Sequence, residues 1–142
     1  MLIDANVLLF ARDSASERHH AAREFLEDAL NGPTRVGLPW PSLTAFLRIA
    51  THPRVYVEPL TTQQAWTQVE SWLAAPASWV PVPTTRHAEV LGELLRRSGV
   101  TGNLMADAHL AALAIEHGLE LCSSDSDFAR FPGLRWRDPT VA

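Results

Sequence analysis

The first eleven residues, MLIDANVLLFA, are apolar at every position except Asp4 and Asn6. A continuous apolar run of this kind favours a buried strand, and we predict one over residues 1–10. A carboxylate inside such a run is costly unless it is paired, hydrogen-bonded or bound to a cation. Asp4 therefore marks either a turn that it caps or a functional site at the end of the first strand.

Strand-like and helical segments alternate along the rest of the chain. Apolar side chains with helical spacing predict helices over five segments: residues 17–30, 41–50, 61–74, 85–97 and 103–117. Short apolar runs predict further strands in RVGLP, WVPVP, LELCSS and LRWRD, and DSDFAR predicts a short helical turn. The prolines of WVPVP favour the edge of a sheet. This alternation predicts an α/β fold, with a central parallel sheet flanked by helices on both sides, in a single domain over residues 1–142.

The composition limits how such a protein can meet its partners. All twelve basic residues are arginine and the formal net charge is -4, so the surface as a whole does not attract nucleic acid, and any such recognition must be local. The single cysteine, Cys122, excludes an internal disulfide. No apolar run approaches the roughly 18 residues of a membrane span, and no basic segment precedes the first apolar run. We therefore expect a cytoplasmic protein with no membrane contact.

Three further aspartates occupy unusual positions. Asp107 shares one predicted helical face with Leu110 and Ala111, which are expected to face the core. Asp125 follows the predicted strand LELCSS, and Asp127 comes two residues later. Because ligand sites in parallel sheets lie beyond the carboxyl ends of the strands, we expect Asp4 and Asp125 to approach one crevice, with Asp107 entering from a neighbouring helix.

Gathered carboxylates repel one another, and the usual reason to assemble them is a hard divalent cation such as Mg²⁺. Such a cation assists the hydrolysis of phosphate esters. Each residue also has a structural interpretation. Asp107 can pair with an arginine, Asp125 can cap the DSDFAR turn, and Asp127 is favoured at the N-terminus of that turn. The histidines show no spacing that suggests a zinc site.

Four segments carry a family resemblance: MLIDANVLLFA, LTAFLRIATHPRV, GNLMADAHLAALAIEHG and SSDSDFARFPGLRW. Together, and in this order over almost the whole chain, they resemble the PIN-domain ribonucleases and, more narrowly, the VapC toxins of bacterial toxin–antitoxin modules. The resemblance implies a PIN-like fold and an endoribonuclease that depends on Mg²⁺, for which Mn²⁺ can substitute. It also implies a homodimer, an RNA substrate such as tRNA, and neutralisation by a VapB-type antitoxin.

The resemblance also assigns roles to individual residues. Asp4 matches the first acidic residue of the family, Asp107 the acidic residue that opens the late helix, and Asp125 the one after the following strand. We expect these three to be catalytic, with Asp4 and Asp107 as the metal ligands. Three residues are expected to support them: Asn6, Ser124 and Asp127.

The chain departs from the family pattern at Ala45, which stands where many members carry a glutamate. This departure leaves open a catalytically weak or inactive module that binds RNA or antitoxin. A phosphoryl-accepting domain, such as a response receiver, also uses a strand-end aspartate and Mg²⁺, but it relies on a lysine, which this chain lacks. For the phosphates of an RNA we expect arginine contacts, with three candidates: Arg48, Arg54 and Arg86.

Overall fold

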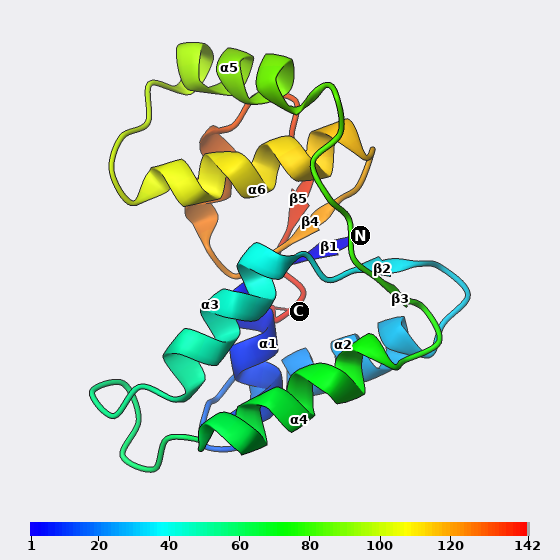
Figure 1. The fold of residues 1–142 in the computed structure, drawn as a ribbon, viewed down its shortest axis with the longest axis vertical. Helices are drawn as coiled ribbons and strands as arrows, with labels where there is room; N and C mark the ends of the chain where they lie inside the picture. The colour runs from blue at the N-terminus through cyan, green and yellow to red at the C-terminus, as the bar shows by residue number, and fades with distance from the viewer. Residues whose placement is uncertain (142) are drawn as a thin grey trace.

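A parallel sheet forms the centre of the computed structural model, which describes residues 1–141 (Figure 1). Over that range the sheet has five strands in the order β3-β2-β1-β4-β5, and every neighbouring pair is parallel. The strands are short: β1 Leu2–Ile3, β2 Val36–Gly37, β3 Ser78–Trp79, β4 Leu121–Cys122 and β5 Trp136–Arg137. The predicted parallel sheet is confirmed, and the WVPVP segment contributes Trp79 to an edge strand, as its prolines indicate.

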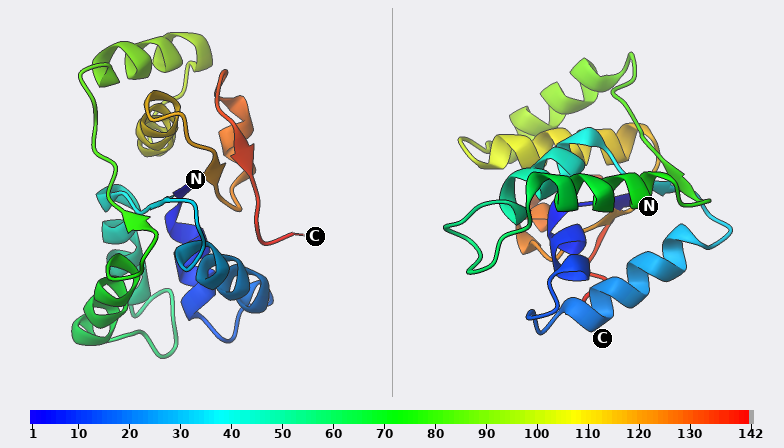
Figure 2. Two further views of the ribbon diagram at one scale, coloured as in Figure 1. Left: turned by 90° about the vertical axis from the view of Figure 1, so that its right-hand side faces the viewer. Right: turned by 60° about the horizontal axis from the view of Figure 1, so that its bottom comes forward.

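Helices cover both faces of this sheet. They are α1 Ala5–Arg12, α2 His19–Leu30, α3 Trp40–Ala50, α4 Thr62–Leu73, α5 His87–Ser98 and α6 Leu104–Glu116, with a 3-10 turn η1 at Ser126–Arg130. Figures 1 and 2 show α5 and α6 on one side of the strands and α1 to α4 on the other. The predicted α/β architecture with helices on both sides is therefore confirmed.

The alternation of side chains along the strands divides the core into two clusters. Ile3 and Cys122 face the cluster built with α1 to α4, whereas Leu2 and Leu121 face the cluster built with α5 and α6. All four side chains are fully buried. Burying one such aliphatic side chain contributes about 2 kcal/mol, so the short strands are held mainly by packing on both faces.

Local sequence signals set the ends of several helices. The Thr61 hydroxyl accepts a hydrogen bond from the Gln64 N–H at 3.1 Å, and the Gln64 side chain accepts one from the Thr61 N–H at 2.9 Å. This capping box begins α4 where we predict it. At the end of α5, Gly99 adopts a φ of 63°, a left-handed conformation that glycine tolerates best.

The predicted strand over residues 1–10 is wrong beyond Ile3. The chain turns at Asp4 and continues as α1, and the Asp4 side chain accepts a hydrogen bond from the Ala5 N–H at 2.8 Å. Val7 and Leu8 are fully buried on this helix, in the cluster shared with α2 and α3. The apolar run thus serves two elements, and its aspartate marks the boundary between them.

Every helix within residues 1–141 is too short or too polar to cross a bilayer.

Candidate active site

The topology brings the four aspartates to one edge of the sheet. β1 and β4 are neighbours, with Ile3 opposite Cys122, so the residues that follow them emerge side by side. Asp4 directly follows β1, and Asp125 stands at the N-cap of η1 after β4. Asp107 lies in the first turn of α6, and Asp127 lies in the first turn of η1.

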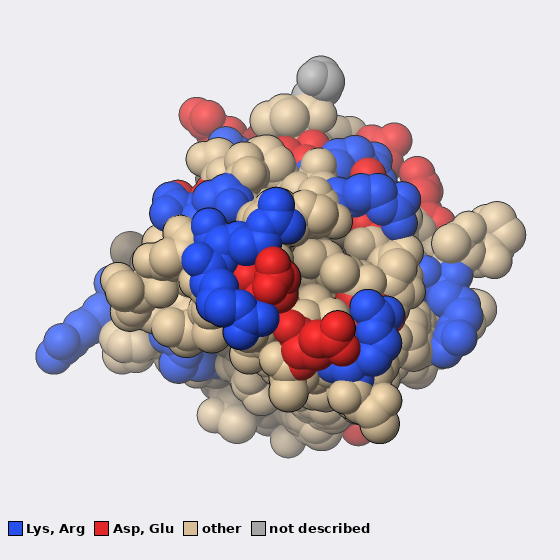
Figure 3. Space-filling model, turned by 90° about the horizontal axis from the view of Figure 1, so that it is seen from above, with Lys and Arg blue, Asp and Glu red and all other residues tan. Residues whose placement is uncertain are grey.

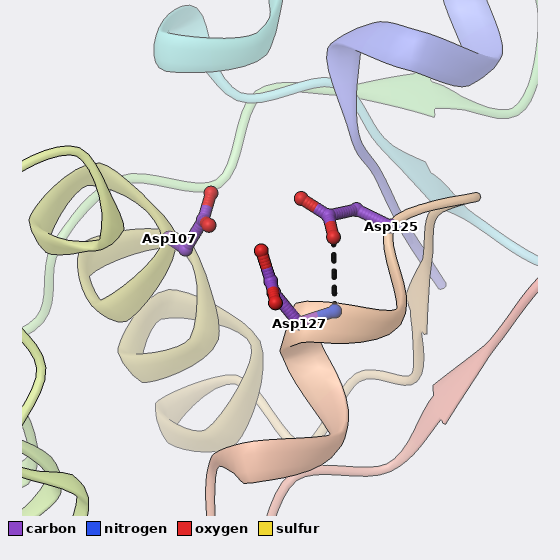
Figure 4. A group of neighbouring side chains, drawn as sticks. All are labelled: Asp107, Asp125 and Asp127. Carbon is purple, nitrogen blue, oxygen red and sulfur yellow. Dashed lines mark hydrogen bonds between the residues drawn. The ribbon is translucent and has the colours of Figure 1, made fainter.

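Three of these carboxylates form a compact group. One oxygen from each of Asp107, Asp125 and Asp127 lies within 4.8 Å of the other two (Figure 4). All three side chains belong to half-buried residues, and Figure 4 shows them directed toward a common space. Several carboxylate oxygens at this spacing are the donor set that Mg²⁺ or Mn²⁺ prefers, so the group is able to hold such an ion.

Burial and the neighbouring carboxylates raise the pKa of Asp107. Burial is the largest cause, followed by the charges of Asp125, Asp4 and Asp127, and together they bring the pKa from 3.8 to about 6. The positive charge of Arg130 opposes this shift. Asp107 is half-buried rather than buried, while Leu110 and Ala111 on the same face are in the core. The predicted stripe is therefore confirmed, and Asp107 lies at its exposed end.

Asp4 is held by three neighbours, two at the start of α1 and one after β4. Its Oδ1 accepts the Ala5 N–H, and its Oδ2 accepts the Ser123 hydroxyl at 2.7 Å and the Asn6 side-chain amide at 3.2 Å. Burial raises the pKa of Asp4, the bonds from Ser123 and Ala5 lower it, and the charge of Asp125 raises it further. Asp4 therefore caps α1 and also lies within the electrostatic reach of the carboxylate group.

Ser123 links the two strand ends, a role that the sequence did not reveal. Its side chain is fully buried, and its hydroxyl oxygen accepts hydrogen bonds from the Asn6 amide at 3.0 Å and the Asp125 N–H at 3.0 Å. Asn6 in turn accepts the Ser124 N–H at 3.1 Å. The Asn6 side chain and the Ser124 backbone therefore lie together beside Asp4, and Ser123 aligns Asp4 with Asp125.

The turn after β4 carries both an aspartate cap and an ion pair. Asp125 Oδ1 accepts the Asp127 N–H at 2.9 Å, which is the capping role expected as an alternative. Arg130 donates from Nη2 to Asp127 Oδ1 at 2.8 Å and from Nε to the Asp127 carbonyl oxygen at 3.1 Å. Asp125 therefore caps the η1 turn and also belongs to the carboxylate group.

Two histidines connect the helix that carries Asp107 to α5. His87 Nδ1 lies 2.8 Å from Glu116 Oε2, and His87 Nε2 lies 3.0 Å from His109 Nδ1. The Glu116 side chain is fully buried and also accepts the Thr84 N–H at 2.8 Å. Burial, then the neighbouring His87, lowers the pKa of His109, and Glu116 partly opposes this. This cluster, which spacing along the chain could not reveal, fixes α6 against α5.

Basic and acidic side chains lie side by side on the surface over α5 (Figure 3). Figure 3, which views the molecule from the α5 side, shows arginines beside acidic side chains. One such pair joins Arg96 to Glu93 at 3.0 Å. Among the sequence candidates for phosphate contact, Arg48 lies in the last turn of α3 and Arg86 at the N-cap of α5. Arg130, which was not among them, is the arginine that contacts the carboxylate group.

The sequence matches known proteins over nearly its full length. The family model described as PIN domain matches residues 1–134. Ribonuclease VapC37 of Mycobacterium tuberculosis is 48% identical over 138 residues, which cover 97% of this chain and 96% of the relative. Ribonuclease VapC33 of the same species is 42% identical over 136 residues, or 96% of this chain and 95% of the relative.

Solved structures share the fold. The VapBC2 complex of Rickettsia felis, bound to a DNA fragment from its promoter, matches with a TM-score of 0.68 at 16% identity, covering 96% of both chains. VapC20 of Mycobacterium tuberculosis, described as a toxin that cleaves the sarcin-ricin loop, matches with a TM-score of 0.67 at 18% identity, covering 94% of this chain and 98% of that one. With the family model and the close relatives, these findings show that the chain belongs to the PIN-domain family, among the VapC ribonucleases.

Proposed function

We propose that this protein is a divalent-metal-dependent endoribonuclease that acts as the toxin of a toxin–antitoxin pair. One observation carries the proposal: in a chain of the PIN-domain family, Asp107, Asp125 and Asp127 converge within 4.8 Å at the edge of the sheet where Asp4 begins α1. The ionised form of Asp107 is disfavoured at this place, since burial and then the charges of the neighbouring carboxylates raise its pKa to about 6.

The chain's own residues would hold the cation and the reacting groups in place. Asp107 and Asp125 offer carboxylate oxygens from opposite sides of the group, and Asp4 is fixed beside them by Ser123. When bound, Mg²⁺ or Mn²⁺ supplies charge neutralisation at a phosphodiester and lowers the pKa of a nearby water. In the hydrolysis, water attacks phosphorus while an ionised carboxylate of the group accepts its proton. The P–O bond to the leaving ribose oxygen breaks, and that oxygen takes up a proton from solvent to leave as a hydroxyl group.

Cleavage of RNA by the purified protein tests the proposal. Bacterial total RNA and a tRNA fraction are incubated with Mg²⁺, with Mn²⁺ and with a chelator, and new 5′ ends are mapped. We expect specific cuts that require the cation and that disappear in Asp4→Asn and Asp107→Asn. Asp28→Asn, which removes an exposed carboxylate on α2, is the matched control and should cut normally. Full activity in Asp4→Asn or Asp107→Asn would exclude this site as the centre of cleavage.

Ala45 is the reason to consider a second function, binding without cleavage. It is half-buried on α3, at the position aligned with a glutamate in many family members. A site with fewer carboxylates favours an inactive module that binds RNA or antitoxin without cutting. The same assay separates the two functions, because such a module would retain RNA in a filter-binding experiment and produce no new 5′ ends with either cation.

We also propose a VapB-type antitoxin as the partner, since several structural neighbours were solved as VapBC complexes. A groove of about 610 Å³ lies between α1, α3 and the arm that connects α3 to α4. Val55 and Val57 on this arm are exposed, and both line the groove. On α4, Trp66 is exposed, whereas Trp72 is a core residue that packs edge-on against Phe46, with the two ring centroids 4.8 Å apart.

The remaining expectations complete the proposal. We propose that residues 1–142 act as a single domain, that the protein forms a homodimer, and that it works in the cytoplasm, where its RNA substrate, such as tRNA, is found. Light scattering of the purified chain tests the dimer. A monomer at all concentrations, with the groove still protected by antitoxin in hydrogen exchange, would assign the groove to the antitoxin alone.

A further inference from the structure

The carboxylate group is too negative to receive an RNA phosphate without help. Asp4, Asp107, Asp125 and Asp127 lie close enough to affect one another electrostatically, as the causes of the Asp107 pKa shift show. A single divalent cation neutralises only half of four ionised carboxylates. A phosphodiester that enters the site adds another negative charge, so a positively charged side chain is needed at the same place.

Arg130 is the side chain in that position. It is the arginine whose charge lowers the pKa of Asp107, and its guanidinium contacts Asp127 within the carboxylate group. Three other arginines pair with acidic residues outside the carboxylate group: Arg18 with Asp138, Arg96 with Glu93 and Arg137 with Glu120. Arg130 therefore differs from these surface arginines because its guanidinium lies against the carboxylate group.

The geometry leaves Arg130 able to bind a further anion. A guanidinium has five N–H donors. Two of them bond to Asp127, from Nη2 to the carboxylate and from Nε to the carbonyl oxygen. The bond to the backbone fixes the plane of the guanidinium whatever the carboxylate does. The Arg130 side chain is 44% exposed, so a phosphate can reach the remaining donors without disturbing the turn.

From these contacts we infer that Arg130 is a phosphate-binding residue of the active site, anchored on Asp127 and directed at the RNA backbone beside the scissile bond. The inference rests on the proposed ribonuclease function. It also gives Asp127 a second role, because a carboxylate already paired with a guanidinium is a weaker cation ligand than a free one. Arg130 therefore strengthens RNA binding and weakens cation binding, two effects of opposite sign from one side chain.

The test compares Arg130→Gln and Arg130→Lys with the wild-type protein. Arg96→Gln is the matched control, because Arg96 also pairs with an acidic residue three positions away in its helix, at 3.0 Å. The RNA probe is a short single-stranded oligonucleotide that spans a site cut by the wild-type protein. Cleavage rates far below saturation give kcat/KM at several salt concentrations, and calorimetry with Mn²⁺ alone gives cation affinity.

We expect Arg130→Gln to lower kcat/KM at least about tenfold, since a hydrogen bond to a charged group is lost. The slope of log kcat/KM against log salt should become shallower by about 0.7, the value for one phosphate contact to a single strand. Mn²⁺ should bind about threefold or more tightly, because a nearby positive charge is removed. Arg130→Lys should keep the salt slope and lose part of kcat/KM, and Arg96→Gln should match the wild type.

A purely structural ion pair gives a different pattern. If Arg130 only orders the turn, Arg130→Gln leaves the salt slope unchanged, and Mn²⁺ binds equally or more weakly because Asp127 loses its orientation. That result would overturn the inference while wild-type cleavage upholds the proposed function. If the wild-type protein cuts no RNA with either cation, the proposed function itself fails and the inference fails with it. Thermal unfolding of each variant confirms that the fold is kept.

Discussion

Neutralising Asp107 should stabilise the protein in the absence of a cation. The pKa of Asp107 is raised from 3.8 to about 6, so the folded state holds this proton more tightly than the unfolded state does. The ionised side chain therefore costs stability, and the cost grows as pH rises through the window from 3.8 to about 6. Without solvent screening, a pKa shift of this size lowers the free energy of unfolding by about 3 kcal/mol. Because the side chain is only half-buried, screening reduces this loss to about 1 kcal/mol.

The helix that carries Asp107 makes the experiment decisive. Asp107 lies in the first turn of α6, where the helix dipole favours a negative charge. By that effect alone, Asp107→Asn would destabilise the protein by about 0.5 kcal/mol. Repulsion and desolvation predict the opposite sign. The direction of the change, and not only its size, therefore reports which effect dominates at this position.

Urea unfolding in the presence of a chelator measures the change in the free energy of unfolding. At pH 7.5 we expect Asp107→Asn to raise the free energy of unfolding by about 1 kcal/mol, and the gain should fade as pH falls toward 4. Glu58→Gln, which removes an exposed carboxylate outside the helices, should show no such pH-dependent gain. With saturating Mn²⁺ the order should reverse, because the wild type binds the ion better. A loss of stability in the chelator at pH 7.5 would show instead that the helix dipole outweighs repulsion and desolvation at Asp107.

Three further predictions concern Asp4, Ala45 and Ser123. Mn²⁺ should raise the midpoint of thermal unfolding of the wild type, and the rise should largely vanish in Asp4→Asn; an equal rise in both would place the ion elsewhere. Ala45→Glu should tighten Mn²⁺ binding by about tenfold in calorimetry, and unchanged affinity in the folded variant would show that Ala45 does not face the site. Ser123→Ala should lower the free energy of unfolding by about 1–3 kcal/mol in urea, since a buried bond to the Asp4 carboxylate is lost; a smaller loss would mean that Ser123 does not hold Asp4.

From α2 onward, the order of strands and helices could be predicted because each segment carries its own period and end signals. Gly99 and the Thr61 capping box define helix ends from local chemistry alone. The N-terminal run could not be divided correctly, because Val7 and Leu8 are buried in a helix just as Leu2 and Ile3 are buried in a strand. When a strand and a helix are both buried on all sides, the apolar residues no longer recur with the period that separates a strand from a helix. Only the cap at Asp4 then marks where the strand ends and the helix begins.

The convergence of the aspartates could also be predicted, because the carboxyl ends of parallel strands share one edge of a sheet. Which carboxylates lie closest could not, since that depends on the η1 turn. The bond between Asp125 and the Asp127 N–H brings Asp127 beside Asp107. The contact of His87 with His109 depends on how α5 packs against α6. The spacing of residues within either helix does not predict that packing.

The hydrogen bonds around Asp4 limit the part it can play as a ligand. Each carboxylate oxygen has about two lone pairs. Oδ2 accepts the Ser123 hydroxyl and the Asn6 amide and is therefore saturated, whereas Oδ1 accepts only the Ala5 N–H among these bonds. Asp4 thus has one oxygen to offer a cation, either directly or through a water. A single fixed oxygen beside three less constrained carboxylates would set the position of the ion, while Asp107, Asp125 and Asp127 supply most of the charge that binds it.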